Sequence, residues 1–282
     1  MLRRDPPGHH VQSSRRDEFA LLAAAGAAGL PVPRVRWCEE DVAVLGAPFL
    51  VMDFVEGETL ARRLLRDAEY VAARAALPQQ LAAALAGIHA LDPALPALAF
   101  LARPPAGETP AAAELARYEQ IFRAITPDPH PALELALRWL APHPPAPAAL
   151  TVVHGDYRVG NVIFGPEGLR AVLDWELAHV GDPLEDLGWL CVRSWRFGAD
   201  DRPAGGLCQR EEFFAAYERG GGRRVDPAAA RWWEVFGNLK WAIICIMQAR
   251  TFLDGAVKSV ELASLGRRVA EMELELLELT EA

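Results

Sequence analysis

Apolar and polar residues alternate in two different ways along this chain. In the first 57 residues, here called the front piece, short apolar runs predict strands at Met1–Arg4, Arg34–Cys38 and Phe49–Val55, the last two forming an antiparallel pair. A helix is expected at Arg15–Ala28, because apolar residues recur there at helical spacing and Gly29 follows.

Beyond residue 57 the pattern is mainly helical, and residues 58–282 are called the helical body. From Thr59 to about Leu91 the chain is rich in Ala, Leu and Arg at helical spacing, and we expect Pro78 to break it. Further helices are predicted at Ala111–Ile125, Ala132–Leu140, Gly181–Val192, Arg210–Arg219, Pro227–Leu253 and Lys258–Leu279. Prolines between 142 and 147 predict a stiff linker ahead of the next strands.

One polar loop interrupts the helical body. Asp156 and Asn161 lie between two short apolar runs, and Asp174 ends a third run, Leu169–Leu173. Phosphoryl transfer needs a carboxylate that orients the attacking hydroxyl, and an amide oxygen and a carboxylate that hold Mg²⁺ against nucleotide phosphates. Mg²⁺ usually takes one or two carboxylates from the protein, with phosphate and water completing its shell. Each piece alone fits an ordinary turn, but together they indicate phosphoryl transfer.

Composition and charge argue against some classes of partner. The chain has 282 residues, of which 51% are hydrophobic and 24% charged, as in ordinary globular proteins. Its net charge of −9 argues against a nucleic-acid partner. The apolar stretch Trp241–Met247 is too short to cross a bilayer, so we expect no membrane partner. The cysteines show no CxxC pairing, and with no secretory leader expected, the sequence favours reduced thiols and a cytoplasmic location.

Several segments resemble the aminoglycoside phosphotransferase family, a branch of the protein-kinase-like fold. HGDYRVGN at 154–161 is similar to its catalytic loop, LDWE at 173–176 to its metal-binding segment, and GDPLEDLGWL at 181–190 to the helix start that follows. LRRxPPG, PVPRV and PFLVMDFVEG are similar to a subgroup related to the phosphotransferase-like domain fused to some acyl-CoA dehydrogenases. The resemblance implies an α+β, two-lobed fold, with a truncated small lobe at 1–57 and a mainly helical lobe at 58–282.

The resemblance also implies roles for individual residues. Asp156 matches the catalytic carboxylate, and Asn161 and Asp174 match the Mg²⁺ ligands that bridge the ATP phosphates. Glu18 matches the carboxylate that pairs with a basic residue on a strand; that residue is usually Lys, and here it is Arg3, with Arg4 the nearby alternative. The segment whose backbone contacts the adenine of ATP is matched by Met52, Asp53, Phe54 and Val55.

Other polar residues have less specific interpretations. We expect His154 to support the loop through a hydrogen bond, and Asp186 to accept backbone N–H groups of the catalytic loop. Asp186 is also explained by the preference of acidic residues for the first turn of a helix. His89 and His179 have no partner motif in the sequence, and no role is predicted for them.

The chain departs from the family at its start. The family has two strands and a phosphate-covering glycine-rich turn before the strand that carries the basic residue, and nothing equivalent precedes Arg3. Either the true start lies upstream, which is our hypothesis, or the cover has been lost. Loss would favour a nucleotide-binding pseudokinase over an active kinase. A metal-dependent hydrolase is a weaker alternative, because no second histidine lies near Asp174. The hydroxylated acceptor, aminoglycoside, hydroxyacyl thioester or another metabolite, stays open, as do ATP versus GTP and the oligomeric state.

Overall fold

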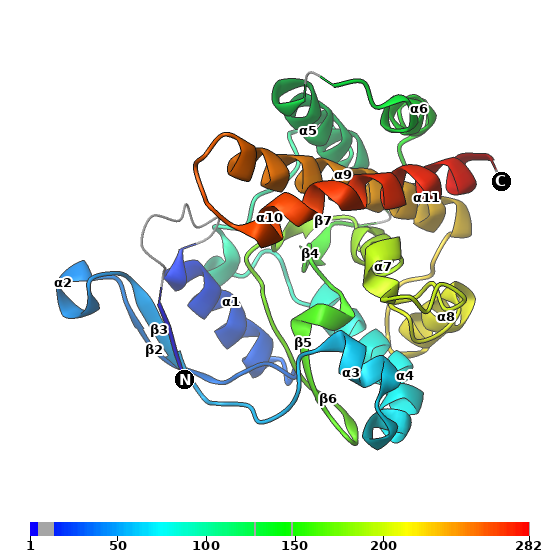
Figure 1. Cartoon of the computed structure of the whole chain (residues 1–282). Coiled ribbons are helices and arrows are strands. Elements are labelled where there is room, and N and C mark those ends of the chain that lie inside the picture. Colours follow the sequence, from blue (N-terminus) through cyan, green and yellow to red (C-terminus); the bar gives the residue numbers. More distant parts are fainter. Residues whose placement is uncertain (5–13, 127, 148, 282) are drawn as a thin grey trace.

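The front piece is a three-stranded antiparallel sheet with a helix packed against it. The structure, a computed structural model, describes residues 1–4, 14–126, 128–147 and 149–281, so the predicted PPG strand end at residues 6–8 lies outside the described residues. The strands are β1 (Leu2–Arg4), β2 (Val35–Glu39) and β3 (Phe49–Met52), in the order β1-β3-β2. Figure 1 shows α1 (Arg15–Ala27) beside this sheet and the one-turn helix α2 (Val42–Leu45) beyond it.

The register of β1 against β3 directs the side chain of Arg3 toward α1. Arg3 pairs with Leu50 in the centre of the sheet, and Leu50 is buried. The helix α1 begins where Ser14 accepts a hydrogen bond from the backbone N–H of Asp17, an ordinary N-cap. The antiparallel pairing of β2 and β3 is as predicted, but β3 ends at Met52 rather than Val55. It ends there because the chain then crosses to the helical body.

The crossing is fixed by main-chain hydrogen bonds. The N–H of Glu58 donates to the carbonyl of Phe164 over 2.9 Å, and the N–H of Phe164 donates back over 3.0 Å. Gly57 is needed at this approach, because a Cβ there would lie 2.4 Å from Cγ2 of Ile163. The N–H of Val172 also donates to the carbonyl of Pro31 over 2.7 Å, a second link between the two regions.

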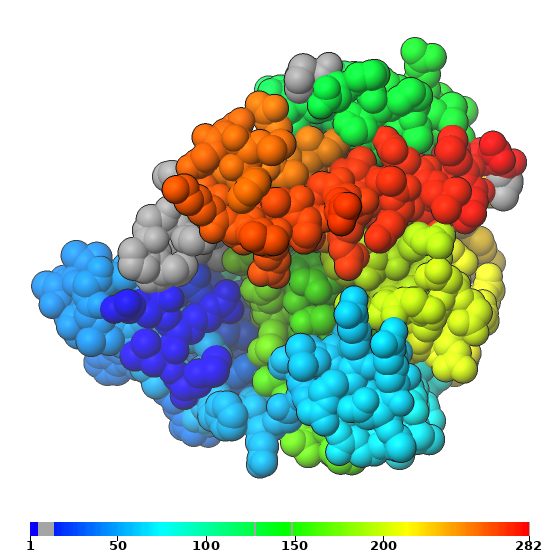
Figure 2. Space-filling model, viewed as in Figure 1, coloured from blue at the N-terminus to red at the C-terminus, as the bar shows by residue number. Residues whose placement is uncertain are grey.

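One long helix, α9 (Pro227–Leu253), lies at the centre of the helical body. The other helices of its described part are α3 (Ala61–Arg66), α4 (Val71–His89), α5 (Pro110–Ile125), α6 (Pro131–Leu140), α7 (Leu184–Leu190), α8 (Arg210–Arg219), α10 (Val260–Leu265) and α11 (Val269–Glu281). The middle of α9 is buried by α5, α6, α7, α10 and α11. Figure 1 shows α10 and α11 in front of α9, and in Figure 2 the C-terminal segments form the orange and red surface of this face. Among the described residues, no helix combines the length and the apolar character needed to cross a bilayer.

The predicted helix break at Pro78 was wrong. The helix α4 continues through Pro78, and the chain breaks earlier, at Asp67. A proline inside a helix costs roughly 3 kcal/mol. Leu77, Leu81 and Leu85 on the same helix are fully buried, and each contributes roughly 1.5–3 kcal/mol. Burial of this face therefore offsets the lost hydrogen bond. The helix predicted at Lys258–Leu279 is also divided, by a 3₁₀ turn at Gly266–Arg268.

Two small antiparallel sheets carry the polar loop. One pairs β4 (Thr151–Val153) with β7 (His179–Gly181), a strand that the sequence pattern did not predict. The other pairs β5 (Val162–Gly165) with β6 (Gly168–Val172). The loop between β4 and β5 carries Asp156 and Asn161, and Asp174 follows β6. The sheets therefore bring residues from separate segments to one place.

Candidate functional site

The backbone of the polar loop is anchored by one buried carboxylate. Asp186, in the first turn of α7, accepts the N–H of His154 over 2.8 Å and the N–H of Gly155 over 2.9 Å. The support expected from Asp186 is therefore present. Gly155 has a φ of +81°, and a Cβ there would lie 2.4 Å from the carbonyl oxygen of Leu177. Only glycine fits this turn, which leads directly into Asp156.

The carboxylate of Asp156 is held by three side chains. Its Oδ1 accepts the indole N–H of Trp189 over 2.6 Å and the Nε–H of Arg158 over 3.0 Å. Its Oδ2 accepts the Nδ2–H of Asn161 over 2.5 Å. Charge-assisted hydrogen bonds of this kind are short and orienting. The Asp156 side chain keeps 15% of its surface exposed, so a small molecule can still reach it.

His154 supports the segment before Asp174. Its Nε2 lies 3.0 Å from the carbonyl of Leu173, and its Nδ1 accepts the N–H of Asp156 over 3.3 Å. Burial lowers the pKa of His154, so the ring is neutral with its proton on Nε2, as these two contacts require. The predicted loop-supporting hydrogen bond is present.

Asp174 lies in a strained turn next to the loop. Its φ is +65°, a left-handed conformation that few residues other than glycine, Asn and Asp adopt. The N–H of Leu173 donates to the carbonyl of Asn161 over 2.8 Å, which joins this turn to the polar loop. Asp174 and Asn161 accordingly line the same cavity.

Arg3 of the front piece reaches this turn. One guanidinium nitrogen lies 2.6 Å from Oε1 of Glu18 and another lies 3.3 Å from Oδ1 of Asp174. Arg4 instead donates to the carbonyl of Leu45, so the pairing expected of one of the two arginines is made by Arg3. Glu18 also pairs with the buried Arg15. Burial raises the pKa of Glu18, and the two arginines oppose that rise.

A cavity of about 340 Å³ gathers most of these side chains. Five of the nine residues predicted for the site line it: Arg3, Glu18, Met52, Asn161 and Asp174. Asp156 adjoins it through its contact with Asn161. Asp53, Phe54 and Val55 do not line it. The carboxylate of Asp53 pairs with Arg36 over 2.7 Å, and the ring of Phe54 is 73% exposed.

The donor set fits a divalent cation that is shared with phosphate. Asn161 turns its amide nitrogen toward Asp156, which leaves its amide oxygen available as a ligand atom. Asp174 supplies a carboxylate whose side chain is part-exposed. Within the described ranges, no cluster of three or more His, Cys, Asp or Glu side chains could hold a metal by itself. Such a set suits Mg²⁺, which relies on substrate phosphates for the rest of its shell.

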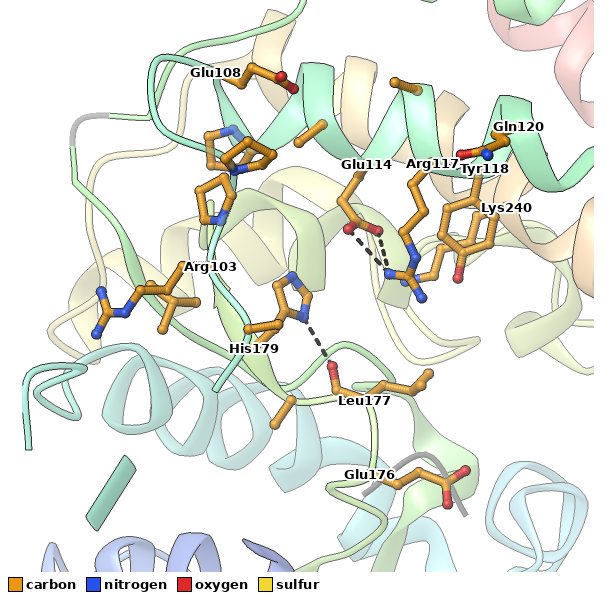
Figure 3. Close-up of a pocket in the computed structure, with 18 residues that line it drawn as sticks. Arg103, Glu108, Glu114, Arg117, Tyr118, Gln120, Glu176, Leu177, His179 and Lys240 are labelled. Carbon is orange, nitrogen blue, oxygen red and sulfur yellow. Dashed lines mark hydrogen bonds and ion pairs between the residues drawn. The ribbon is translucent and has the colours of Figure 1, made fainter. Parts of the chain in front are cut away.

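A second and larger cavity is lined by the residues that follow the Asp174 turn, from Glu176 onward. It measures about 570 Å³ and is walled by residues 102–105, α5, residues 176–180 and Lys240 of α9 (Figure 3). Arg117 pairs with Glu114, one turn earlier on α5, within the same wall. The ring of His179 bonds to the carbonyl of Leu177. Burial and the nearby Asp174 raise the pKa of Glu176. Leu177 contacts Gly155, so this cavity lies next to the catalytic loop.

Five side-chain contacts in and around the site were not predicted from the sequence. Trp189 and Arg158 bind the Asp156 carboxylate, although nothing in their spacing indicated it. His89 bonds to Asp186 over 3.0 Å and to the hydroxyl of Tyr217 over 2.7 Å. His179 lies 3.1 Å from Glu185. No role was predicted for the two histidines. The partners of His89 lie far away in the sequence, and the partner of His179 lies on the helix that follows it, where no motif pairs the two residues.

Glu185, Lys240 and His179 form a buried ionic cluster beneath the second cavity. The ammonium of Lys240 lies 3.1 Å from Oε1 of Glu185. Burial alone would raise the pKa of Glu185, but Lys240 and His179 lower it. Burial also opposes the charge of His179, and Glu185 overcomes this and raises the pKa of His179 to about 9.

The sequence of the chain is similar to those of known proteins. A family model described as "Phosphotransferase enzyme family" matches residues 1–228. Acyl-CoA dehydrogenase family member 10 of Mus musculus is 33% identical over 196 residues, which are 68% of this chain and 18% of that protein. Acyl-CoA dehydrogenase family member 11 of Rattus norvegicus is 29% identical over 249 residues, 82% of this chain and 31% of that protein. The chain thus spans less than a third of the length of these relatives.

Solved structures share the fold. A Ralstonia eutropha protein assigned to the aminoglycoside phosphotransferases has a TM-score of 0.78 at 24% identity, covering 99% of this chain and 85% of its own. Spectinomycin phosphotransferase with ADP and spectinomycin has a TM-score of 0.67 at 11% identity, covering 98% and 85%. A choline/ethanolamine kinase family protein of Mesorhizobium loti has a TM-score of 0.66 at 20% identity, covering 100% and 82%. The expected kinase-like α+β fold is confirmed.

Proposed function

Because the chain belongs to the phosphotransferase enzyme family, we propose that it uses ATP and Mg²⁺ to phosphorylate a hydroxyl group of a small molecule. The observation that carries the proposal is one shared cavity. Arg3, Asn161 and Asp174 line it, and Asp156 reaches it through Asn161. A cation, two potential metal ligands and a carboxylate are the groups that phosphoryl transfer requires.

Each residue has a defined task in this proposal. Arg3, held by Glu18, would contact the nucleotide phosphates with a charge that is always present. Asn161 and Asp174 would hold Mg²⁺, which when bound neutralises charge on the phosphates. Asp156 would orient the acceptor hydroxyl and take its proton on Oδ2. Positioning and charge neutralisation would supply most of the rate.

The adenine would lie against the end of β3. Met52 lines the cavity and is the one member of the predicted contact segment that does so; Asp53, Phe54 and Val55 stay predictions for a backbone contact. Solved relatives of this fold were crystallised with ADP, AMP or GDP, which supports a nucleotide at the site. ATP rather than GTP is our choice, to be tested by competition.

The acceptor would occupy the cavity of about 570 Å³. Its wall combines small apolar residues of the 102–105 and 110–116 segments with cations and carboxylates in similar number. A polycationic aminoglycoside would be better served by an excess of carboxylates. The relatives are described as acyl-CoA dehydrogenases, so a hydroxyacyl thioester is the first acceptor to test, alongside aminoglycosides and other small alcohols.

We place the protein in the cytoplasm. All four cysteines are free, and three of them are buried. Free thiols are the rule in a reducing compartment.

The decisive experiment compares Asp156→Asn with the unaltered protein. ATP consumption is measured with Mg²⁺ across a panel of hydroxylated acceptors. Asp156→Asn should lower turnover at least about 100-fold, because proton transfer by a positioned carboxylate contributes 10²–10⁴-fold. Asp201→Asn is the matched control, since Asp201 is exposed and does not line the cavity. Wild-type turnover by Asp156→Asn would disprove the role of Asp156.

The alternative is a pseudokinase that binds nucleotide without transferring phosphate. Thermal stabilisation by ATP and Mg²⁺ is expected for both functions. A protein that is stabilised by ATP, yet consumes none with any acceptor, would be the pseudokinase. The intact carboxylate of Asp156 favours the enzyme, because a simple binder has no need to orient an acceptor.

A further inference from the structure

The two oxygens of the Asp156 carboxylate are held differently. Oδ1 receives two donors, the indole N–H of Trp189 at 2.6 Å and the Nε–H of Arg158 at 3.0 Å. Oδ2 receives one donor, the Nδ2–H of Asn161. A carboxylate oxygen has about two lone-pair sites, so Oδ1 is fully used, whereas Oδ2 can accept one more hydrogen bond.

The helix that carries Trp189 already anchors the loop backbone. Asp186 and Trp189 lie three residues apart on α7 and so lie on one face of the helix. Asp186 binds the N–H groups of His154 and Gly155, while Trp189 binds the side chain of the next residue. The helix is itself fixed on α9, because Gly188 lets the two backbones approach so closely that a Cβ there would lie 2.5 Å from the carbonyl carbon of Trp233.

The indole of Trp189 has no room to move. The residue is 2% exposed, and its ring centroid lies 5.4 Å from that of Trp195 and 6.3 Å from that of Trp241. The ammonium of Lys240 lies 4.8 Å from the Trp189 ring centroid. A cation against the ring draws electron density from it and makes its N–H a better donor.

We propose that Trp189 is a positioning residue that donates its indole N–H to Oδ1 of Asp156 and thereby keeps Oδ2 facing the acceptor hydroxyl. The inference rests on the proposed role of Asp156. As the hydroxyl oxygen bonds to the γ-phosphorus, its proton passes to Oδ2, and the bond from the γ-phosphorus to the bridging oxygen breaks to release ADP. Trp189 exchanges no proton in this step; it fixes the geometry of the oxygen that does.

Trp189→Phe tests this directly, because it keeps an aromatic ring and removes the N–H. We expect kcat to fall about tenfold or more, the effect of losing a hydrogen bond to a charged group, with the KM for ATP unchanged. Trp241→Phe is the matched control. It removes an indole N–H from the same aromatic cluster, but that N–H binds the hydroxyl of Ser194 over 2.9 Å.

The outcomes separate the two proposals. If the unaltered protein turns over and Trp189→Phe matches it, or if Trp189→Phe and Trp241→Phe lose the same kcat, the inference is wrong and the function stands. If the unaltered protein never turns over, the proposed function fails.

A second measurement does not depend on the folding of Trp189→Phe. In protein labelled with ¹⁵N-tryptophan, Asp156→Asn should displace the indole N–H signal of Trp189 and leave that of Trp241 in place. An unmoved Trp189 signal would overturn the inference, with or without enzymatic turnover.

Discussion

The front piece and the helical body hold their charged side chains in different ways. In the front piece, Arg3 is part-exposed and spans two carboxylates, Glu18 of its own region and Asp174 of the body. In the body, the side chain of Lys240 is 4% exposed, and its ammonium lies against Glu185 and two aromatic rings. The first arrangement is open to solvent, whereas the second is enclosed. We therefore propose that the body sets the geometry of proton transfer and that the front piece sets nucleotide affinity.

The largest loss of activity is expected from a substitution of Asp174, which belongs to the helical body. Asp174→Asn is expected to lower kcat at least about 100-fold, because the neutral amide removes the charge that would bind Mg²⁺. Asn also tolerates the left-handed backbone at this position, so the fold should persist. Steady-state kinetics over a range of Mg²⁺ concentrations measures the loss. Unchanged kcat and unchanged Mg²⁺ dependence would remove Asp174 from the proposed metal site.

Substitutions in the buried ionic cluster of Glu185, Lys240 and His179 should lower the stability of the fold. Lys240→Met leaves Glu185 with one cationic partner, His179, and is expected to cost about 3–5 kcal/mol of unfolding free energy. Urea denaturation measures it. Lys258→Met is the control, since Lys258 is exposed and should change stability by less than about 0.5 kcal/mol. Equal stabilities of the two variants would contradict the rigid character assigned to the body.

In the front piece, substitution of Arg3 should have a smaller effect on activity, and this effect should depend on the salt concentration. Arg3→Met should raise the KM for ATP roughly tenfold, the equivalent of one charge-assisted hydrogen bond of about 1.5 kcal/mol. The effect should shrink as salt is added, because Arg3 is part-exposed. Arg4→Met, which loses a bond to the carbonyl of Leu45, is the control. A drop in kcat with unchanged KM would place Arg3 in the chemical step instead.

The stability of the body should also depend on pH. Since Glu185 raises the pKa of His179 from 6.5 to about 9, the ion pair stabilises the fold fully below pH 6.5, and this contribution is lost as pH rises through 9. His179→Gln should therefore flatten the fall in stability over this window. Thermal unfolding between pH 6 and 10 measures it, with the exposed His143→Gln as the control. A slope as steep as that of the unaltered protein would show that another group is responsible.

The sequence predicted the chain segments of the site better than its side-chain contacts. Asp156, Asn161 and Asp174 could be found because they punctuate apolar strand runs, and the helices α8 and α9 have the predicted bounds. The helix break predicted at Pro78 was wrong because local helix propensity does not reflect how much of α4 is buried. Trp189 and His89 could not be found because their partners come from distant segments, and no local pattern encodes such a contact.

The main-chain pairing of Glu58 with Phe164 has a mechanical consequence. It clamps the start of the body to β5, so a rotation of the front piece would have to pivot at residues 53–56 and break the hydrogen bond between Val172 and Pro31. Such a rotation would change the separation of Arg3 and Asp174 while leaving Asn161 and Asp156 in register. Nucleotide exchange could then proceed without disturbing the alignment of the proton acceptor.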